Sequence, residues 1–387
     1  MKANPGGQLS PNEIIGRDRL IARLWRILDR QSIVLTAERR TGKTSVLQKM
    51  AAEAPVQKLM IYRDLEDVKS TLEFAELVLQ DVDEFLSRSK RTAARARQWL
   101  SHIAGIEVGG IVKLPSTIAP HWKTLLVKTI EDLSENQDRS LIFLWDELPL
   151  MLYSIKRNES ENAAMEVLDT LRHLRQTHSS LRMIYTGSIG LHNVLTSLKQ
   201  AGYANDPIND MLSVDVPPLL HTDAVMLGLQ LIEGEGIIID DPAHAAQFIA
   251  QSVDNIPFYI HHIIDQLTER GEATCIEDID SIINTCIISP QDPWHLKYYR
   301  QRIDVYYNLD EKSFSLAILD ILANANNPLP FSELFNQIKA RIETENKEFA
   351  REVLTLLQRD HYIIRLSDGA YVFRFGLIKR FWQLERG

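Results

Sequence analysis

Short apolar runs recur through the first 216 residues, and helical spacing of apolar positions separates them. Such runs, bounded by turn residues and too short for a helix, are typical of buried strands in a parallel sheet. This order of elements predicts an α/β domain. The predicted strands cover residues 32–36, 59–62, 141–145, 181–188 and 212–216.

The pattern becomes mainly helical after Pro217-Pro218, and this double proline is the clearest domain boundary in the sequence. Helical patterns fill residues 219–290, where Asp241-Pro242 and Ile256-Pro257 mark helix starts. Three helical patterns and a hairpin with an Asp368-Gly369 turn follow in residues 291–387, which suggests a winged helix. We therefore predict domains over 1–218, 219–290 and 291–387.

Composition narrows the class of protein. The chain has 387 residues, 45% of them hydrophobic, and a formal charge of −9. This charge argues against a protein that coats nucleic acid, although it permits a local basic patch. No apolar stretch approaches the roughly 18 residues of a membrane span, and the first residues lack the apolar core of a signal peptide. We expect a cytoplasmic protein with no membrane partner.

The first strand leads into a loop that carries candidate chemistry. The loop continues into Gly42-Lys43-Thr44-Ser45, where a helical pattern begins. This is the strand–loop–helix setting of a P-loop, which binds phosphates through backbone N–H groups and the helix N-terminus. Lys43 would reach the β- and γ-phosphates, and the Thr44 hydroxyl would hold Mg²⁺. The predicted phosphate-binding residues are Ala37, Arg40, Thr41, Gly42, Lys43, Thr44 and Ser45.

One position departs from the G-x-x-x-x-G-K-[ST] pattern, because Ala37 stands where the first glycine is expected. Alanine tolerates a positive φ poorly. We therefore expect the backbone to enter this loop differently from a P-loop that begins with glycine.

A second candidate group follows the strand at 141–145, which ends in Asp146-Glu147. A buried parallel strand delivers such carboxylates to the carboxyl edge of the sheet, where ligands bind. Asp146 would hold Mg²⁺, and Glu147 would act as the general base for water. We expect adjacent parallel strands to bring this pair to Lys43. The next strand ends in Thr186-Gly187-Ser188, where Ser188 is the candidate γ-phosphate sensor and Thr186 the alternative; a plain turn at Gly187 would also explain the residues.

Together, these motifs and Ile15-Gly16-Arg17-Asp18 resemble those of archaeal-type P-loop ATPases. These prokaryotic proteins lie between the origin-recognition AAA+ ATPases and the STAND signalling ATPases. The resemblance implies an AAA+-like parallel sheet, a helical lid and a winged helix, with ATP and Mg²⁺ bound. It also implies that Arg17 and Pro257 contact the nucleotide.

The sequence departs from AAA+ ring ATPases, which carry an arginine finger before their last core strand. No arginine lies between Leu191 and Leu212, where Lys199 would lack the bidentate fork. A finger supplied by a partner can raise the rate ~10³–10⁵-fold. We therefore expect a slow ATPase, or one triggered by a partner.

Three functions are consistent with the sequence. The first is an ATP-dependent switch whose partner is an effector protein or a second copy of the chain. The second is a DNA-binding ATPase of the origin-recognition or transposition-helper type, with DNA contacted by the winged helix and by the basic run from Arg88 to Arg97. That run is also explained as a solvated helix face. The third, a nucleotide-binding scaffold without catalysis, ranks last because Glu147 is present.

Overall fold

The computed structural model describes residues 1–88, 94–104, 114, 116–135, 139–187, 190–203, 205–271 and 275–386. The chain divides into two compact units. The sheet unit comprises Asp18–Thr36 and Lys43–Val216, and the C-terminal unit comprises Met1–Arg17, Ala37–Gly42 and Pro217–Gly387. Each unit has a hydrophobic core of its own. The predicted hairpin at 106–114 lies outside the described residues except for Leu114.

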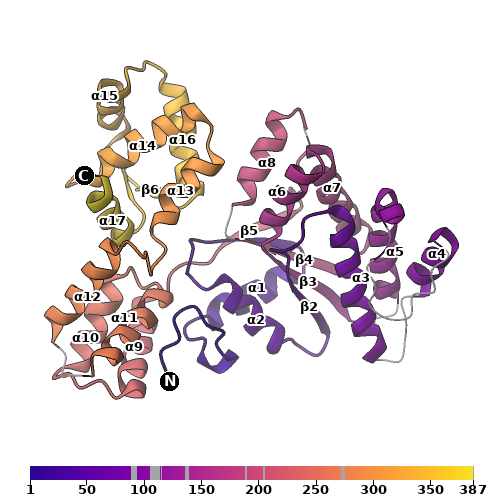
Figure 1. The fold of residues 1–387 in the computed structure, drawn as a ribbon, viewed down its shortest axis with the longest axis horizontal. Coiled ribbons are helices and arrows are strands. Elements are labelled where there is room, and N and C mark those ends of the chain that lie inside the picture. The colour runs from indigo at the N-terminus through magenta and orange to yellow at the C-terminus, as the bar shows by residue number, and fades with distance from the viewer. Residues whose placement is uncertain are drawn as a thin grey trace. The chain divides into compact units, whose positions relative to one another are not determined.

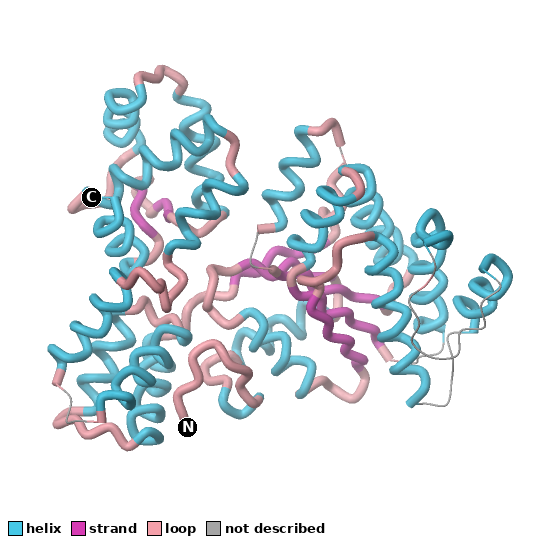
Figure 2. The backbone as a smooth tube through the Cα atoms, in the orientation of Figure 1, coloured by secondary structure: helices cyan, strands magenta, loops and turns pink. Residues whose placement is uncertain are grey.

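The sheet unit is built on five parallel strands in the order β2-β3-β4-β1-β5 (Figure 2). The strands are β1 Ser32–Thr36, β2 Lys58–Asp64, β3 Ser140–Asp146, β4 Leu181–Thr186 and β5 Met211–Asp215. Their side chains are mostly buried, because helices cover both faces of the sheet. This parallel α/β fold confirms the predicted fold class.

One expectation about the sheet is wrong. The strands before Lys43 and before Glu147 are β1 and β3, and β4 lies between them rather than the two being adjacent. The order of the strands in the sheet does not follow from their order along the chain. The carboxyl ends of all these parallel strands nevertheless share one edge of the sheet.

Helices lie on both faces, with α1 and α2 on one and α6 and α7 on the other (Figure 1). The crossover from β1 to β2 runs in one direction across the sheet and the later crossovers run in the opposite direction. Because crossovers are right-handed, their helices fall on opposite faces. The helices are α1 Asp18–Leu28, α2 Lys43–Ala52, α3 Thr71–Arg88, α4 Ala94–Ala104, α5 Trp122–Glu135, α6 Leu148–Asn158, α7 Glu161–Thr177 and α8 Leu191–Gln200, with a 3₁₀ turn η2 at Ser116–His121.

The C-terminal unit begins with helices where the sequence predicts them. The Asp241 side chain accepts a hydrogen bond from the N–H of His244 at 2.9 Å and so caps its helix. Pro257 is the first residue of the next helix, where its missing N–H has no cost. The elements are η1 Pro11–Glu13, α9 His221–Glu235, α10 Pro242–Ser252, α11 Pro257–Arg270, α12 Ile276–Ile288 and α13 Lys297–Tyr306.

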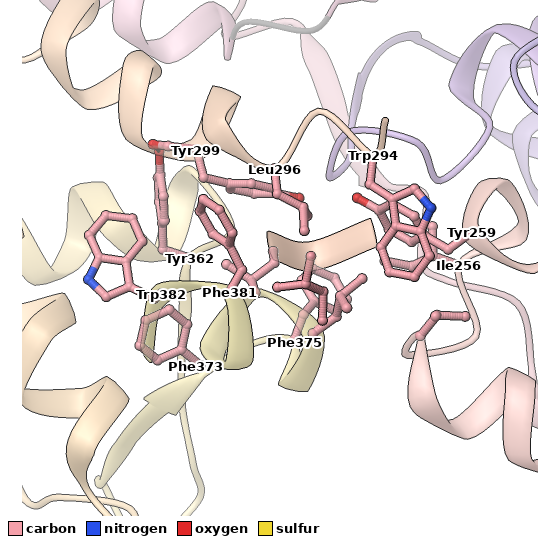
Figure 3. Close-up of a cluster of buried hydrophobic side chains, with 14 of the residues drawn as sticks. Ile256, Tyr259, Trp294, Leu296, Tyr299, Tyr362, Phe373, Phe375, Phe381 and Trp382 are labelled. Atoms are coloured by element: carbon pink, nitrogen blue, oxygen red, sulfur yellow. Dashed lines mark hydrogen bonds between the residues drawn. The ribbon is translucent and has the colours of Figure 1, made fainter. Parts of the chain in front are cut away.

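The remaining chain adds three helices, a two-stranded antiparallel hairpin and a final helix. Large aromatic side chains from α11, α13, the hairpin and α17 belong to one buried cluster (Figure 3). Residues from both predicted C-terminal domains thus share a single core. That the last part is a winged helix stays a prediction. The elements are α14 Leu309–Asn324, α15 Phe331–Ile342, α16 Lys347–Arg359, β6 Ile363–Arg365, β7 Tyr371–Phe373 and α17 Gly376–Arg386.

Candidate functional site

The loop Ala37–Gly42 joins β1 to α2 at the carboxyl edge of the sheet. Its left-handed positions are Arg40, with φ 69°, and Gly42, with φ 90°. Ala37 is not among the positive-φ residues. Alanine at this position is therefore not strained, because the left-handed positions of the loop fall at Arg40 and Gly42. Whether the backbone enters this loop differently from a P-loop that begins with glycine stays a prediction.

The backbone of this loop is fastened by buried side chains of the C-terminal unit. Arg17 donates to the carbonyl of Thr41 at 2.5 Å and to that of Pro217 at 2.8 Å. The Thr41 hydroxyl donates to the carbonyl of Glu38 at 2.8 Å. Burial lowers the pKa of Arg17 to about 10, so the guanidinium stays charged at neutral pH. The side chain of Arg17 therefore acts on the loop as well as being a predicted nucleotide contact.

Lys43 and Thr44 begin α2 and belong to the sheet unit. The Thr44 hydroxyl donates to Asp146 Oδ2 at 2.7 Å. Burial raises the pKa of Asp146, while the hydrogen bond from Thr44 and the nearby charge of Lys43 act to lower it. The three predicted residues thus lie together even though β4 separates their strands.

Glu147 follows Asp146 in a left-handed conformation, with φ 55°, at the N-cap of α6. Its N–H donates to Asp146 Oδ1 at 3.1 Å. Asp64, the last residue of β2, is the register partner of Asp146. Burial and the carboxylates of Asp146 and Asp64 raise the pKa of Tyr62. Tyr62 and Asp64 are not among the predicted site residues.

The end of β4 comes close to the acidic pair. A Cβ at Gly187 would lie 3.3 Å from Glu147 Oε2 and 2.7 Å from Pro149 Cδ. The hydroxyl of Thr186 is buried and has no hydrogen-bond partner among the described residues. Ser188, the candidate sensor, lies outside them, so its role stays a prediction. The same holds for the nucleotide contact expected of Pro257.

The oxygens of Thr44 and Asp146 suit a hard cation such as Mg²⁺. In the part of the chain that the structure describes, no three metal-ligating side chains form a ready metal site. A Mg²⁺ site of one or two carboxylates completed by substrate phosphates and water does not require such a cluster. The residues present therefore fit a magnesium–phosphate complex. No helix among those described is long and apolar enough to cross a bilayer.

Comparison with known proteins identifies the fold. The chain matches no protein-family model and no curated protein sequence. It is similar to the solved Walker-type ATPase PABY2304 of Pyrococcus abyssi, with a TM-score of 0.66 and 15% identity over 99% of this chain and 100% of that one. It is also similar to the Aeropyrum pernix ORC2 protein in its ADPNP–ADP complexes, with a TM-score of 0.53 and 12% identity over 98% and 96% of the two chains. The chain thus shares its fold with this Walker-type ATPase and with the ORC2 protein.

Proposed function

We propose that the protein binds ATP with Mg²⁺ and hydrolyses it slowly, or on contact with a partner, as a nucleotide-dependent switch. The observation that carries this proposal is the 2.7 Å hydrogen bond between Thr44 and Asp146, which brings the two predicted magnesium ligands into contact. The similarity to a Walker-type ATPase and to a protein solved with ADPNP and ADP supports the same function.

Each group of the candidate site has a defined role in this reaction. The loop N–H groups and the N-terminus of α2 hold the phosphates, and Lys43 neutralises charge on the β- and γ-phosphates. Mg²⁺ bound at Thr44 and Asp146 would neutralise further charge as the phosphoryl group transfers. Glu147 accepts a proton from a water whose oxygen attacks the γ-phosphorus. The bond to the β–γ bridging oxygen breaks, giving ADP and inorganic phosphate.

The expected slowness follows from the missing arginine between Leu191 and Leu212. Lys199 of α8, the candidate substitute, offers only a point charge. An effector protein or a second copy of the chain that inserted an arginine would raise turnover by ~10³–10⁵-fold.

Binding is tested by titrating the full chain with a fluorescent ATP analogue. Lys43→Ala should weaken binding by about 10- to 100-fold, because it removes charge-assisted hydrogen bonds to phosphate. Lys123→Ala, an exposed lysine of α5, is the matched control and should bind as the wild type does. Equal affinity of the Lys43→Ala and wild-type proteins would refute the proposed site.

Hydrolysis is tested with Glu147→Gln, which keeps the size of the side chain and removes the base. We expect ATP to remain bound while phosphate release falls by about 10²–10⁴-fold. Phosphate release at the wild-type rate would remove Glu147 from the mechanism while leaving nucleotide binding intact.

The DNA-binding alternative gains no comparable support. Arg97 forms an ion pair with Asp83 at 3.0 Å, and Arg351 of α16 forms one with Glu348. Lys90 and Arg91 lie outside the described residues. Duplex binding with a steep salt dependence, lost on neutralising Arg91, Arg95 and Arg97, remains the test of this prediction.

A further inference from the structure

Two arginines of the phosphate-binding loop rest on aromatic rings of the C-terminal unit. The guanidinium carbon of Arg39 lies 4.1 Å from the ring centre of Tyr298, and that of Arg40 lies 4.2 Å from the ring centre of Phe258. Both distances are within the range of cation–π attraction. Tyr298 is the second residue of α13, and Phe258 is the second residue of α11.

These rings are the main partners of the two guanidinium groups. Among the described residues, neither Arg39 nor Arg40 forms an ion pair with a carboxylate, and the buried Nε of Arg40 has no hydrogen-bond partner. Arg40 also has a left-handed backbone, which costs energy in a residue with a Cβ. Stacking on Phe258 helps to offset that cost.

Glu38, the residue before the two arginines, is turned into the same unit. Only 1% of it is exposed, and its Oε1 accepts the N–H of Arg39 at 2.7 Å. Its charge lies close to Tyr259 and Tyr299, whose pKa values are raised by burial first and by Glu38 second. Three consecutive loop residues therefore face two pairs of neighbouring aromatic residues, one pair on α11 and one on α13.

A buried path continues from α13 to the hairpin (Figure 3). The Tyr362 hydroxyl donates to the carbonyl of Tyr299 at 2.7 Å, and the two rings meet edge to face. Tyr362 immediately precedes β6. A shift of the loop arginines would move the half-buried Tyr298 first and then reach the hairpin through Tyr299 and Tyr362. These two side chains are fully buried and transmit displacement because a packed core yields little.

We propose that Tyr298 and Phe258 are positioning residues that couple occupancy of the phosphate-binding loop to α11, α13 and the hairpin of the C-terminal unit. The coupling rests on the proposed nucleotide binding and identifies the elements that would respond to it. Since coupling between two sites is reciprocal, rings that hold the loop ready for phosphate are in turn held more firmly when phosphate binds.

The experiment is hydrogen exchange on the full-length chain, with and without ATP and Mg²⁺. We expect ATP to slow exchange in residues 297–306 of the wild type and of Tyr298→Phe, which keeps the ring. Tyr298→Leu should lose this protection and bind ATP about 2- to 30-fold more weakly, the range expected from losing one cation–π contact. Tyr306→Leu, a half-buried tyrosine of the same helix, is the control and should keep the protection.

A second measurement guards against simple misfolding of a variant. In a double-mutant cycle of Arg39→Gln and Tyr298→Leu on ATP affinity, the second substitution should have little further effect after the first. Additive losses would overturn the coupling, and so would unchanged exchange at α13 in a wild type that binds ATP. Failure of the wild type to bind ATP at all would instead overturn the proposed function.

Discussion

Asp146 is a buried carboxylate whose charge suits a bound cation but lowers the stability of the fold. Burial raises its pKa, the Asp64 carboxylate acts in the same direction, and the hydrogen bond from Thr44 only partly compensates. A carboxyl group whose pKa is higher in the folded than in the unfolded state stabilises the fold while it is protonated. That stabilisation is lost as the pH rises through the folded pKa.

Asp146→Asn should therefore raise the thermal midpoint of the nucleotide-free protein at pH 7, because the amide removes the buried charge and still accepts a hydrogen bond from Thr44. The gain should shrink as the pH falls and disappear below the ordinary carboxyl pKa of 3.8. Scanning fluorimetry across pH measures both effects. ATP with Mg²⁺ should reverse the order by stabilising only the wild type; a variant less stable than the wild type at pH 7 would contradict the argument.

Gly187 allows the end of β4 to lie close to Pro149 and Glu147 at the start of α6. An added Cβ would lie 2.7 Å from the ring of Pro149, so Gly187→Ala must displace either the end of β4 or the start of α6. We expect a loss of about 1–3 kcal/mol in the free energy of unfolding, typical of overpacking, together with slower ATP turnover because Glu147 moves. At Gly376 no atom lies closer than 3.5 Å to an added Cβ. Gly376→Ala should therefore hardly change the free energy of unfolding measured in urea.

Some of the site was predictable from the sequence because its residues are marked locally. Lys43, Thr44 and Asp146 each follow a strand in a recognisable motif, and the structure brings them together. Gly187 and Phe258 gain their importance from a side chain distant in sequence, so no local pattern reveals it. Their contacts depend on the order of strands and on packing within the C-terminal unit.

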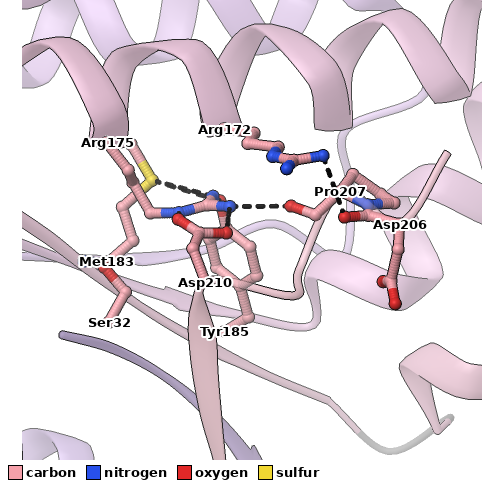
Figure 4. Close-up of polar contacts among 8 residues, drawn as sticks. All are labelled: Ser32, Arg172, Arg175, Met183, Tyr185, Asp206, Pro207 and Asp210. Carbon is pink, nitrogen blue, oxygen red and sulfur yellow. Dashed lines mark hydrogen bonds and ion pairs between the residues drawn. The ribbon is translucent and has the colours of Figure 1, made fainter.

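At the scale of elements, α7, β4 and the chain before β5 are joined by a buried arginine (Figure 4). Arg175 binds both carboxylate oxygens of Asp210 at 2.8 Å, the Tyr185 hydroxyl at 2.5 Å and the carbonyl of Pro207 at 2.7 Å. The Tyr185 ring stacks on Trp145, the residue before Asp146. The network thus supports the strand that carries the candidate acids.

Arg175→Ala should lower the free energy of unfolding by about 3–5 kcal/mol, because it leaves a partly buried carboxylate without its partner. Arg172 lies one turn earlier on α7 and donates to the exposed carbonyl of Asp206 at 3.1 Å. Arg172→Ala should change the stability by no more than about 0.5 kcal/mol. Urea unfolding of the two variants makes the comparison, and similar losses in both would rule out a special role for the buried network.

The sequence predicted the type of most elements better than their arrangement. The strands and seven helices of the C-terminal unit, α9 to α12 and α14 to α16, lie within a few residues of the predicted positions, since periodicity and proline mark them. The sequence does not predict helices α6, α8, α13 and α17, nor the insertion of β4 between β1 and β3. Strand order depends on which surfaces pack best, and a list of elements does not contain that information.

At the scale of the whole molecule, the two separate cores predict complex unfolding. Each core should melt with its own cooperativity, so the calorimetric enthalpy should exceed the van't Hoff enthalpy of a single transition. ATP with Mg²⁺ should shift the melting of the wild type and leave Lys43→Ala unchanged. One transition with equal enthalpies would show instead that the units unfold as one.

The discontinuous C-terminal unit also bears on how the protein is made. Residues Met1–Arg17 and Ala37–Gly42 are translated long before their packing partners in Pro217–Gly387. The parallel sheet can therefore form on the nascent chain before the packing partners of the loop have been made. A nascent chain that has emerged only as far as residue 216 would display a folded sheet whose loop lacks its clamps, so competence for nucleotide is gained only after residues 217–387 have followed.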